Sequence, residues 1–213
     1  MLFLDWRDQA PAAALGAAAA TAAAGWVVTA TRLHTRTRQL HRAHRDPVTG
    51  LLTRAAWEPS AQAALRRPGS ALGLIDLDGF KSVNDTHGHK VGDHVLRTVS
   101  ARLKAELGLA AVAGRLGGDE LAFVDRGICP DQLDGLLTAL TAPIPVTSTK
   151  DVRVGASLGI SALGRAVTLS DALVAADLAM YEAKTRRCGW RLHTPQSEAG
   201  DTPRWPAVEV ISQ

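Results

Sequence analysis

The sequence contains little cysteine, and this shortage excludes cross-linked and cysteine-based metal proteins. Only Cys129 and Cys188 occur among the 213 residues, far apart and without the spacing of metal ligands. We therefore expect neither a disulfide framework nor a zinc site built on cysteines. Two free thiols in a reducing compartment are the expected state.

The larger part of the chain also lacks an excess of positive charge. The formal charge of +3 arises in residues 1–45, where six arginines against two aspartates give +4. Residues 46–213 keep 24 − 6 = 18 Lys and Arg against 21 − 2 = 19 Asp and Glu, a net charge of −1. This part has the composition of one globular domain without a basic footprint, so we expect no nucleic-acid partner.

Charge is absent altogether from "PAAALGAAAATAAAGWVVTAT", residues 11–31. As a helix this segment would be about 32 Å long, at ~1.5 Å per residue, which is enough to cross a hydrocarbon core of ~30 Å. An alanine-rich soluble helix is the alternative, because few of its residues are strongly apolar. A signal peptide is disfavoured, since two acids and one arginine precede the segment. We expect one transmembrane helix here.

A basic run, "RLHTRTRQLHRAHR", follows at residues 32–45. A nucleic-acid-binding arm is one interpretation, but beside a membrane span the positive-inside rule explains the run better. That rule predicts a single-pass protein of the inner (cytoplasmic) membrane, with everything after residue 32 in the cytoplasm. The basic run would then be a juxtamembrane helix or linker.

The stretch "GRLGGDELAFVD", Gly114 to Asp125, places two carboxylates beside a tight turn. Apolar residues on both sides predict two short strands, and two adjacent glycines have the backbone freedom that a hairpin turn needs. Asp119 and Glu120 carry like charges that repel each other. We therefore expect something to bind at this turn that favours two adjacent carboxylates.

A second pair of acids follows a short apolar run. Residues 71–77 read as a buried strand, and Asp76 and Asp78 fall at its end with their side chains on one face. A carboxylate at the end of a buried strand is a candidate metal ligand. The alternative is that Asp76 or Asp78 caps the helix that follows.

Taken together, these segments resemble the GGDEF family of bacterial diguanylate cyclases. The matching motifs are "DPVTGLLTR", "LIDLDGFKSVNDTHGHKVGDHVL", "RLGGDELAF", "VRVGASLGIS" and "ADLAMYEAK", in the family's order over residues 46–192. The resemblance implies a palm-like α/β (α+β) fold akin to nucleotidyl cyclases, with a central, mostly antiparallel five-stranded sheet wrapped by helices. Periodicity independently predicts helices at 94–107 and 170–184 and strands at 110–116, 121–125 and 152–161.

The resemblance also implies an activity and its residues. Two molecules of GTP would be condensed to cyclic di-GMP and two pyrophosphates by two-metal phosphoryl transfer, with each subunit of a homodimer supplying one GTP. Asp76, the carbonyl of Leu77 and Asp119 would hold two Mg²⁺ or Mn²⁺ ions per site, and Glu120 would support them. The implied substrate-binding residues are Asn84 and Asp93, which would read guanine, and Lys81, Lys184 and Phe80. Without the resemblance, Asn84 and Asp93 could equally be helix caps.

One departure from the family pattern weakens this expectation. Cys188 stands where the resemblance expects a phosphate-binding arginine, and Arg187 is the nearest replacement. The alternative function is therefore a catalytically weakened domain that holds GTP as a receptor or scaffold. A second departure concerns regulation, because Gly108 and Ala111 stand where many members carry the Arg and Asp of a product-inhibition site.

We expect four regions in the chain. Residues 1–31 would comprise a short N-terminus and the transmembrane helix, 32–45 the juxtamembrane segment, and 46–193 the GGDEF domain. Residues 194–213 are rich in Pro and small polar residues, which predicts a disordered tail. Within that tail, Trp205 to Ile211 are apolar enough to dock elsewhere.

Overall fold

The computed structural model describes residues 44–147, 150–162 and 168–193. The predicted membrane span at 11–31, most of the basic run and the predicted tail at 194–213 lie outside these residues. Among the helices that are described, none is both long enough and apolar enough to cross a membrane.

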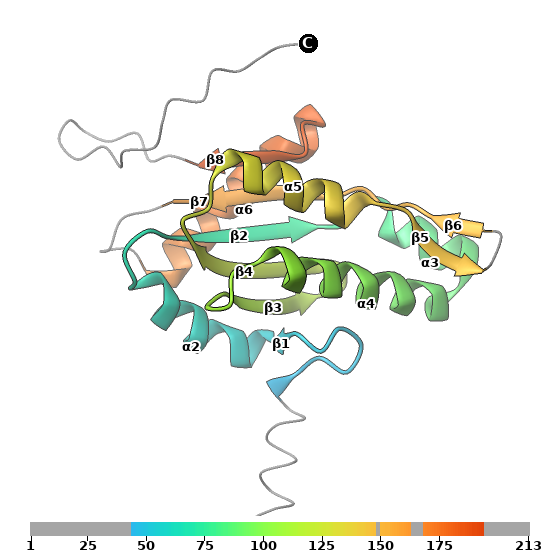
Figure 1. Ribbon diagram of the computed structural model, residues 1–213, viewed down its shortest axis with the longest axis horizontal. Coiled ribbons are helices and arrows are strands. Elements are labelled where there is room, and N and C mark those ends of the chain that lie inside the picture. The colour runs from blue at the N-terminus through green and yellow to red at the C-terminus, as the bar shows by residue number, and fades with distance from the viewer. Residues whose placement is uncertain (1–43, 148–149, 163–167, 194–213) are drawn as a thin grey trace, which may run out of the picture. The chain divides into compact units, whose positions relative to one another are not determined.

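A six-stranded mixed sheet forms the centre of the domain (Figure 1). Its strands, in spatial order, are β1 (Leu52–Thr53), β3 (Val112–Gly117), β4 (Glu120–Arg126), β2 (Ser70–Asp76), β7 (Ser157–Ser161) and β8 (Trp190–His193). The three inner pairings are antiparallel, whereas β1 pairs with β3 and β8 pairs with β7 in parallel. The expected five-stranded, mostly antiparallel sheet is therefore wrong in strand number and in its edges.

A separate two-stranded pair, β5 (Ile144–Thr147) with β6 (Lys150–Val152), accounts for a second difference from the sequence-based expectation. The run 152–161 was expected to be one strand. Instead β6 ends at Val152 and β7 begins at Ser157. Between them, Gly155 exchanges backbone hydrogen bonds of 2.9 and 3.2 Å with Asp78, which follows β2.

Helices cover both faces of the sheet. They are α2 (Arg54–Leu65), α3 (Phe80–His87), α4 (His89–Glu106), α5 (Pro130–Thr141) and α6 (Leu169–Arg186). In Figure 1, α4 and α5 cross in front of the strands and α6 passes behind them. The helices predicted at 94–107 and 170–184 are confirmed as the greater part of α4 and α6.

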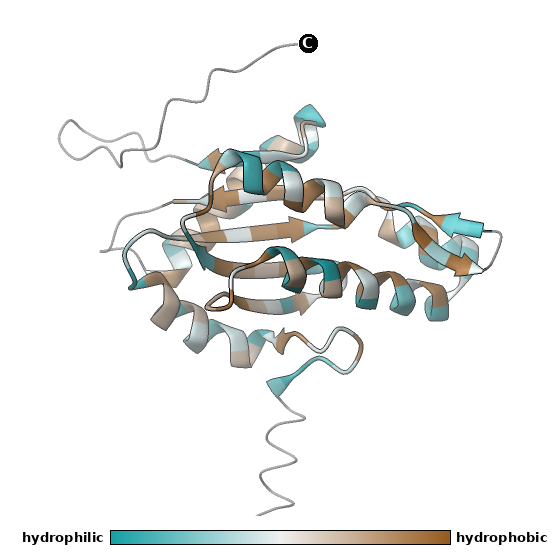
Figure 2. Ribbon diagram, viewed as in Figure 1, coloured by the Kyte–Doolittle hydropathy of each residue, from teal (hydrophilic) through white to brown (hydrophobic). Residues whose placement is uncertain are grey.

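The two helical layers enclose two apolar clusters, one on each face of the sheet, and Figure 2 shows the inner strands as the most hydrophobic part of the ribbon. The larger cluster joins the sheet to α3, α4 and α5, and the smaller one joins it to α2 and α6. Trp57 anchors the smaller cluster: it is fully buried and donates a 3.0 Å hydrogen bond from Nε1 to the carbonyl of Val112. Gly114 is required beneath it, because a Cβ there would collide with the indole.

Candidate active site at the end of strand β2

Acidic side chains gather where β2 ends and the β3–β4 turn begins. Asp76, the last residue of β2, pairs directly with Glu120, the first residue of β4. Asp119 lies in the turn just before Glu120, and Gly118 adopts a φ of 49° that favours glycine. The sequence prediction that the turn brings its two carboxylates opposite Asp76 agrees with this register.

Lys184 supplies a positive charge to the same cluster from the last turns of α6. Its Nζ lies 2.5 Å from Asp76 Oδ2 and 3.9 Å from Asp78 Oδ1. The hydrogen bond to Asp76 raises the pKa of Lys184 above its ordinary value, against partial burial, and the charges of Asp76, Asp78 and Asp119 add to the effect. Lys184 and the three carboxylates thus form one electrostatic group at the C-terminal end of the central strand β2.

Asp78 has a structural partner that the sequence did not reveal. The Ser157 hydroxyl donates to its two carboxylate oxygens at 3.2 and 3.0 Å. The predicted alternative, a cap of the following helix, is wrong for Asp78, because α3 has Gly79 at its N-cap and no side chain caps it. Asp78 instead ties the end of β2 to the start of β7.

The oxygen atoms at the C-terminal end of β2 are ligands of the kind that a hard cation binds. Among the described residues, no three His, Cys, Asp or Glu side chains lie together in a way that could hold a metal by themselves. Mg²⁺ in phosphate-handling sites, however, is held by one or two carboxylates together with substrate phosphates. Two carboxylates and the Leu77 carbonyl satisfy that requirement, and the Lys184 ammonium against Asp76 demonstrates that this carboxylate attracts a cation.

A second group of predicted residues meets between α3 and α4. Phe80 and Asn84 lie one turn apart on α3 and both contact Gly92 on α4, where a Cβ would collide with Asn84 Oδ1 and lie 3.3 Å from Phe80 Cζ. Asp93 is the next residue of α4. The structure therefore brings Asn84 and Phe80 next to Asp93, and it does so through the close approach that Gly92 allows.

Helix capping does not account for Asn84 or Asp93. Both residues lie inside their helices. The N-cap positions of α3 and α4 are Gly79 and Gly88, and no side chain makes a capping hydrogen bond at either position. Asp93 is partly exposed and lies 3.9 Å from Arg97 one turn further along α4. Its carboxylate is therefore available at the surface of the domain.

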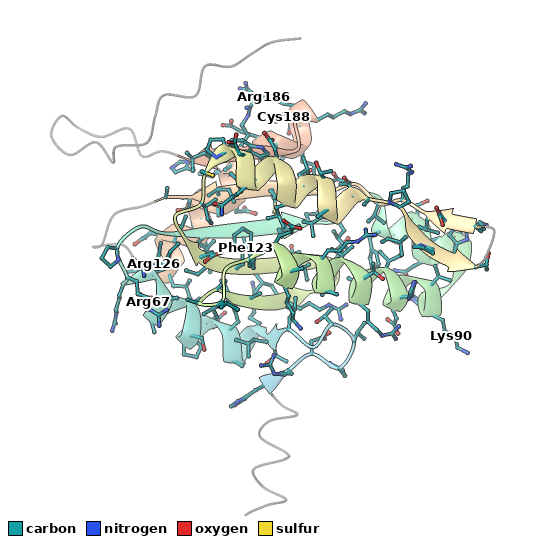
Figure 3. The ribbon with its side chains drawn as sticks, in the orientation of Figure 1. Arg67, Lys90, Phe123, Arg126, Arg186 and Cys188 are labelled. Atoms are coloured by element: carbon teal, nitrogen blue, oxygen red, sulfur yellow. The ribbon has the colours of Figure 1, made fainter. Side chains whose placement is uncertain are left out.

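An open cavity of about 700 Å³ adjoins the acidic cluster on the side of α5 and β7. Lys184, Arg187, Cys188, Asp78 and Ser157 contribute to its walls. Figure 3 labels Cys188 beside the end of α6, where the chain turns back into β8. Arg187 ends α6 in the left-handed conformation, with a φ of 52°, which is uncommon for a residue other than glycine. Lys184 and Arg187 thus present two cationic side chains to one cavity.

Arg115 holds the Gly-Gly turn, and sequence reasoning missed this role. Its Nε and Nη2 donate to the carbonyl of Gly118 at 3.0 and 2.7 Å, while Nη1 lies 3.1 Å from both carboxylate oxygens of Asp46. Asp46 in turn accepts bonds from the backbone N–H groups of Val48 and Thr49. Both segments stood out as motifs, but nothing in either indicated that they pair.

These contacts lower the pKa of Asp46. Burial alone would raise it, but hydrogen bonds from Thr49 and Arg115, together with the charge of Arg115, outweigh burial and hold the pKa below its ordinary value. The Arg115–Asp46 pair is mostly buried, at 16% and 17% side-chain exposure. The Arg115–Asp46 pair therefore stabilises the turn that carries Asp119.

Lys81 is the predicted residue that the structure leaves apart. It is exposed on α3, and none of the ion pairs found in the described ranges joins it to the carboxylates. Among the other predicted residues, the carboxylates at the C-terminal end of β2 lie beside Lys184, Arg187 shares a cavity wall with Lys184, and Asn84 and Phe80 lie next to Asp93 between α3 and α4. Such an arrangement can bind cations and a polyphosphate and can recognise a ring with N–H donors.

Comparison with known protein families and relatives agrees with this geometry. The family model described as "Diguanylate cyclase, GGDEF domain" matches residues 43–188. An uncharacterized protein of Streptomyces ambofaciens is 44% identical over 76% of this chain and 88% of its own length. The diguanylate cyclase TpbB of Pseudomonas aeruginosa PAO1 is 35% identical over 71% of this chain, and this chain covers 37% of TpbB.

A solved structure also supports the fold. The GGDEF domain of the Pseudomonas aeruginosa protein TpbB (YfiN) superimposes with a TM-score of 0.65 at 33% identity, over 71% of this chain and 95% of that one.

Proposed function

The chain belongs to the GGDEF family, and from that premise we propose that it is a diguanylate cyclase that converts two GTP into cyclic di-GMP and two pyrophosphates. The proposal rests on the cluster at the C-terminal end of β2, which is formed by Asp76, Asp119, Glu120 and Lys184. It offers acidic oxygens for cations and an ammonium group for phosphate within one site. Phosphoryl transfer needs positioning and charge stabilisation more than covalent chemistry.

The reaction assigns a task to each member of the cluster. The 3′-hydroxyl of one GTP attacks the α-phosphate of the other, so that a new P–O bond forms, the α–β phosphoanhydride bond breaks and pyrophosphate leaves. Asp119 accepts the proton of the hydroxyl and passes it to solvent. Repetition with the roles exchanged closes the ring.

Asp76, the Leu77 carbonyl and Asp119 would hold two Mg²⁺ or Mn²⁺ ions, with Glu120 in support. Such ions neutralise the triphosphate and increase the acidity of the attacking hydroxyl. Lys184 would exchange its contact with Asp76 for one with the substrate's phosphates. In the free protein the hydrogen bond to Asp76 raises the pKa of Lys184 and so favours the ammonium form, which is the form that binds phosphate.

Guanine selectivity is assigned to Asn84 and Asp93. A carboxylate accepts from guanine's N1–H and exocyclic amine, and an amide can both donate and accept. Adenine lacks that pair of donors. Phe80 packs against Gly92 beside Asn84, and Lys81 contributes positive charge at the exposed side of α3.

Arg187 is proposed to replace the arginine that the family places at position 188. Its αL conformation and its position in the wall of the cavity that Lys184 also lines support this assignment. Cys188 itself contributes no charge. We expect the replacement to preserve phosphate binding at reduced strength, because the side chain starts one residue early.

Two features of the whole protein complete the proposal. Each ring needs two bound GTP molecules, so turnover would occur across a homodimer. We also propose that residues 11–31 cross the inner membrane once and that the GGDEF domain lies in the cytoplasm, on the strength of the uncharged segment and the arginines that follow it.

The competing function is a GTP receptor or scaffold, favoured by Cys188. To separate the two, the full chain is incubated with GTP and Mg²⁺, nucleotide products are measured by mass spectrometry, and GTP binding is measured in parallel by calorimetry. The enzyme yields cyclic di-GMP and pyrophosphate. Saturable GTP binding with no cyclic di-GMP would establish the receptor instead.

A further inference from the structure

The outer face of α6 is apolar in a way that its packing within the domain does not explain. The buried face of this helix consists of Ala172, Ala175, Ala176, Ala179 and Ala183. Three of its larger apolar side chains nevertheless point outward: Val174, Leu178 and Tyr181 are 59%, 53% and 69% exposed. Their spacing of four and three residues places them on one stripe. A surface helix normally has the opposite arrangement.

Close packing explains why the fully buried positions of α6 are all alanines. At Gly159 on β7 a Cβ would collide with the backbone of α6 at Ala176 and Met180, so the helix lies directly on the strand. No such constraint acts on the outer face, where polar residues would be tolerated. The apolar stripe therefore needs a separate reason.

A hollow beside the stripe extends the apolar surface toward the sheet. It has a volume of about 240 Å³, lies between α2 and α6, and is lined by Leu74, Leu116, Leu173, Val174 and Met180. This is smaller than the ~300–1,000 Å³ typical of small-molecule sites. The hollow suits a single large side chain. We call the hollow and the stripe together the α6 outer surface.

The chain itself contains a segment of matching character. Residues 194–204, "TPQSEAGDTPR", contain no strongly apolar residue, and residues 205–211, "WPAVEVI", contain a tryptophan, two valines and an isoleucine. The described domain ends with β8 at His193, and β8 packs against α6. At up to ~3.4 Å per residue, the twelve steps from His193 to Trp205 can span about 40 Å, more than the roughly 27 Å length of α6.

Charge also agrees with this occupant. Glu120 and Asp177 lie at the rim of the hollow, and the basic residue there, Arg54, is 3.7 Å from Glu58. Arg204 directly precedes Trp205 in the sequence. An extended segment that inserted the indole would thus bring a guanidinium to an acidic rim.

We propose that residues 205–211 of the same chain cover the α6 outer surface, with Trp205 in the hollow. The segment would lie against Leu116 and next to Glu120, and would shield one side of the turn that carries Asp119. This inference does not depend on the proposed cyclase activity.

The single tyrosine of the chain makes the proposal directly testable. Tyr181 lies on the stripe and is the only tyrosine among the 213 residues. The rate of its nitration by tetranitromethane is measured by peptide mass spectrometry in the full chain and in Trp205→Ala, Leu178→Glu and the double variant. Leu109→Glu is the matched control, because Leu109 is fully exposed in the turn between α4 and β3.

We expect nitration of Tyr181 to be several-fold faster in Trp205→Ala and in Leu178→Glu, no faster still in the double variant, and unchanged in Leu109→Glu. The wild-type rate should not vary with protein concentration. An unchanged rate in Trp205→Ala would overturn the proposal. Protection that disappears on dilution would also contradict it, because a second copy would then be the occupant.

Discussion

Asp93 is the residue to which we assign base selectivity. Its side chain is partly exposed, lies in the helix that packs against Asn84, and does not cap that helix. Replacing it in Asp93→Ala leaves guanine's N–H donors unpaired, which should weaken GTP binding by ~1–3 kcal/mol and leave the weaker ATP binding almost unchanged. Calorimetric titration of the variant with both nucleotides measures the difference.

Arg97→Ala is the control for this substitution, because it removes the side chain that lies 3.9 Å from Asp93 without touching the carboxylate. GTP affinity should be nearly retained in it. Equal losses of GTP and ATP binding in Asp93→Ala would mean that the carboxylate supports α4 rather than reading the base.

Arg187 and Cys188 give a second test at single residues. If Arg187 has taken over phosphate binding, Arg187→Ala should raise the KM for GTP about tenfold, and Cys188→Arg should lower it. The two changes should also be non-additive, since a restored arginine at 188 makes Arg187 dispensable. Initial-rate kinetics on the two single variants and the double variant measure the coupling, and strictly additive effects would remove Arg187 from the site.

Individual residues also indicate where sequence reasoning succeeded. Asp76, Asp119 and Lys184 were assigned through separate motifs, and the structure brings them together. The partners of Asp78 and Asp46 were not foreseen, because Ser157 and Arg115 are 79 and 69 residues away. Contacts over such separations depend on strand register, which a local pattern does not specify.

The Gly-Gly turn and the loop at residues 46–50 act as one element, because Arg115 joins them. Arg115→Met should free the carbonyl of Gly118, remove the cationic partner of Asp46 and loosen the turn that carries Asp119. We expect a loss of roughly 2 kcal/mol in the free energy of unfolding, together with a fall in kcat that exceeds any rise in KM. Chemical denaturation and initial-rate kinetics on the same preparation measure both quantities.

Asp46→Asn tests the same contact through pH. The lowered pKa of Asp46 means that its contribution to stability is fully present above the ordinary value of 3.8 and is lost as the pH falls through the folded-state value. The stability deficit of Asp46→Asn relative to wild type should therefore be constant near neutral pH and shrink below 3.8. A deficit that does not change with pH in that range would mean that the charge of Asp46 does not matter.

The sheet illustrates which elements a sequence can predict. The inner strands β2, β3 and β4 were expected because they are apolar runs bounded by turn residues. The edge strands β1 and β8 contain two and four residues and pair in parallel with strands far along the chain. Strands that short have too few residues for an alternating pattern, so the predicted sheet lacked its edges.

In the proposed reaction each copy of the described domain supplies one acidic cluster and one guanine-reading pair, so that a single copy would hold only half of the product ring. The specific rate of cyclic di-GMP formation should therefore rise with protein concentration at saturating GTP and level off as the dimer becomes dominant. Product formation over a hundredfold range of protein concentration tests this. A specific rate that is independent of concentration throughout, in a protein that sediments as a monomer, would contradict the dimer.

Product inhibition should be weak in the same assay. Gly108 and Ala111 have no polar side chains where many relatives carry an arginine and an aspartate, and the Gly108 N–H donates to Asp125 within the domain instead. We expect initial rates at saturating GTP to change little when cyclic di-GMP is added. Strong noncompetitive inhibition would reveal a product site elsewhere on the protein.

The central claim is that the carboxylates at the end of β2 catalyse the condensation of GTP, and Asp119→Ala tests it most directly. Asp119 is partly exposed in the turn, so its removal should leave the fold and the melting temperature nearly unchanged. Cyclic di-GMP formation from GTP and Mg²⁺ is measured for the full chain and for this variant at equal concentration. The account predicts product from the wild type and none above background from Asp119→Ala, while undiminished turnover in the variant would contradict it.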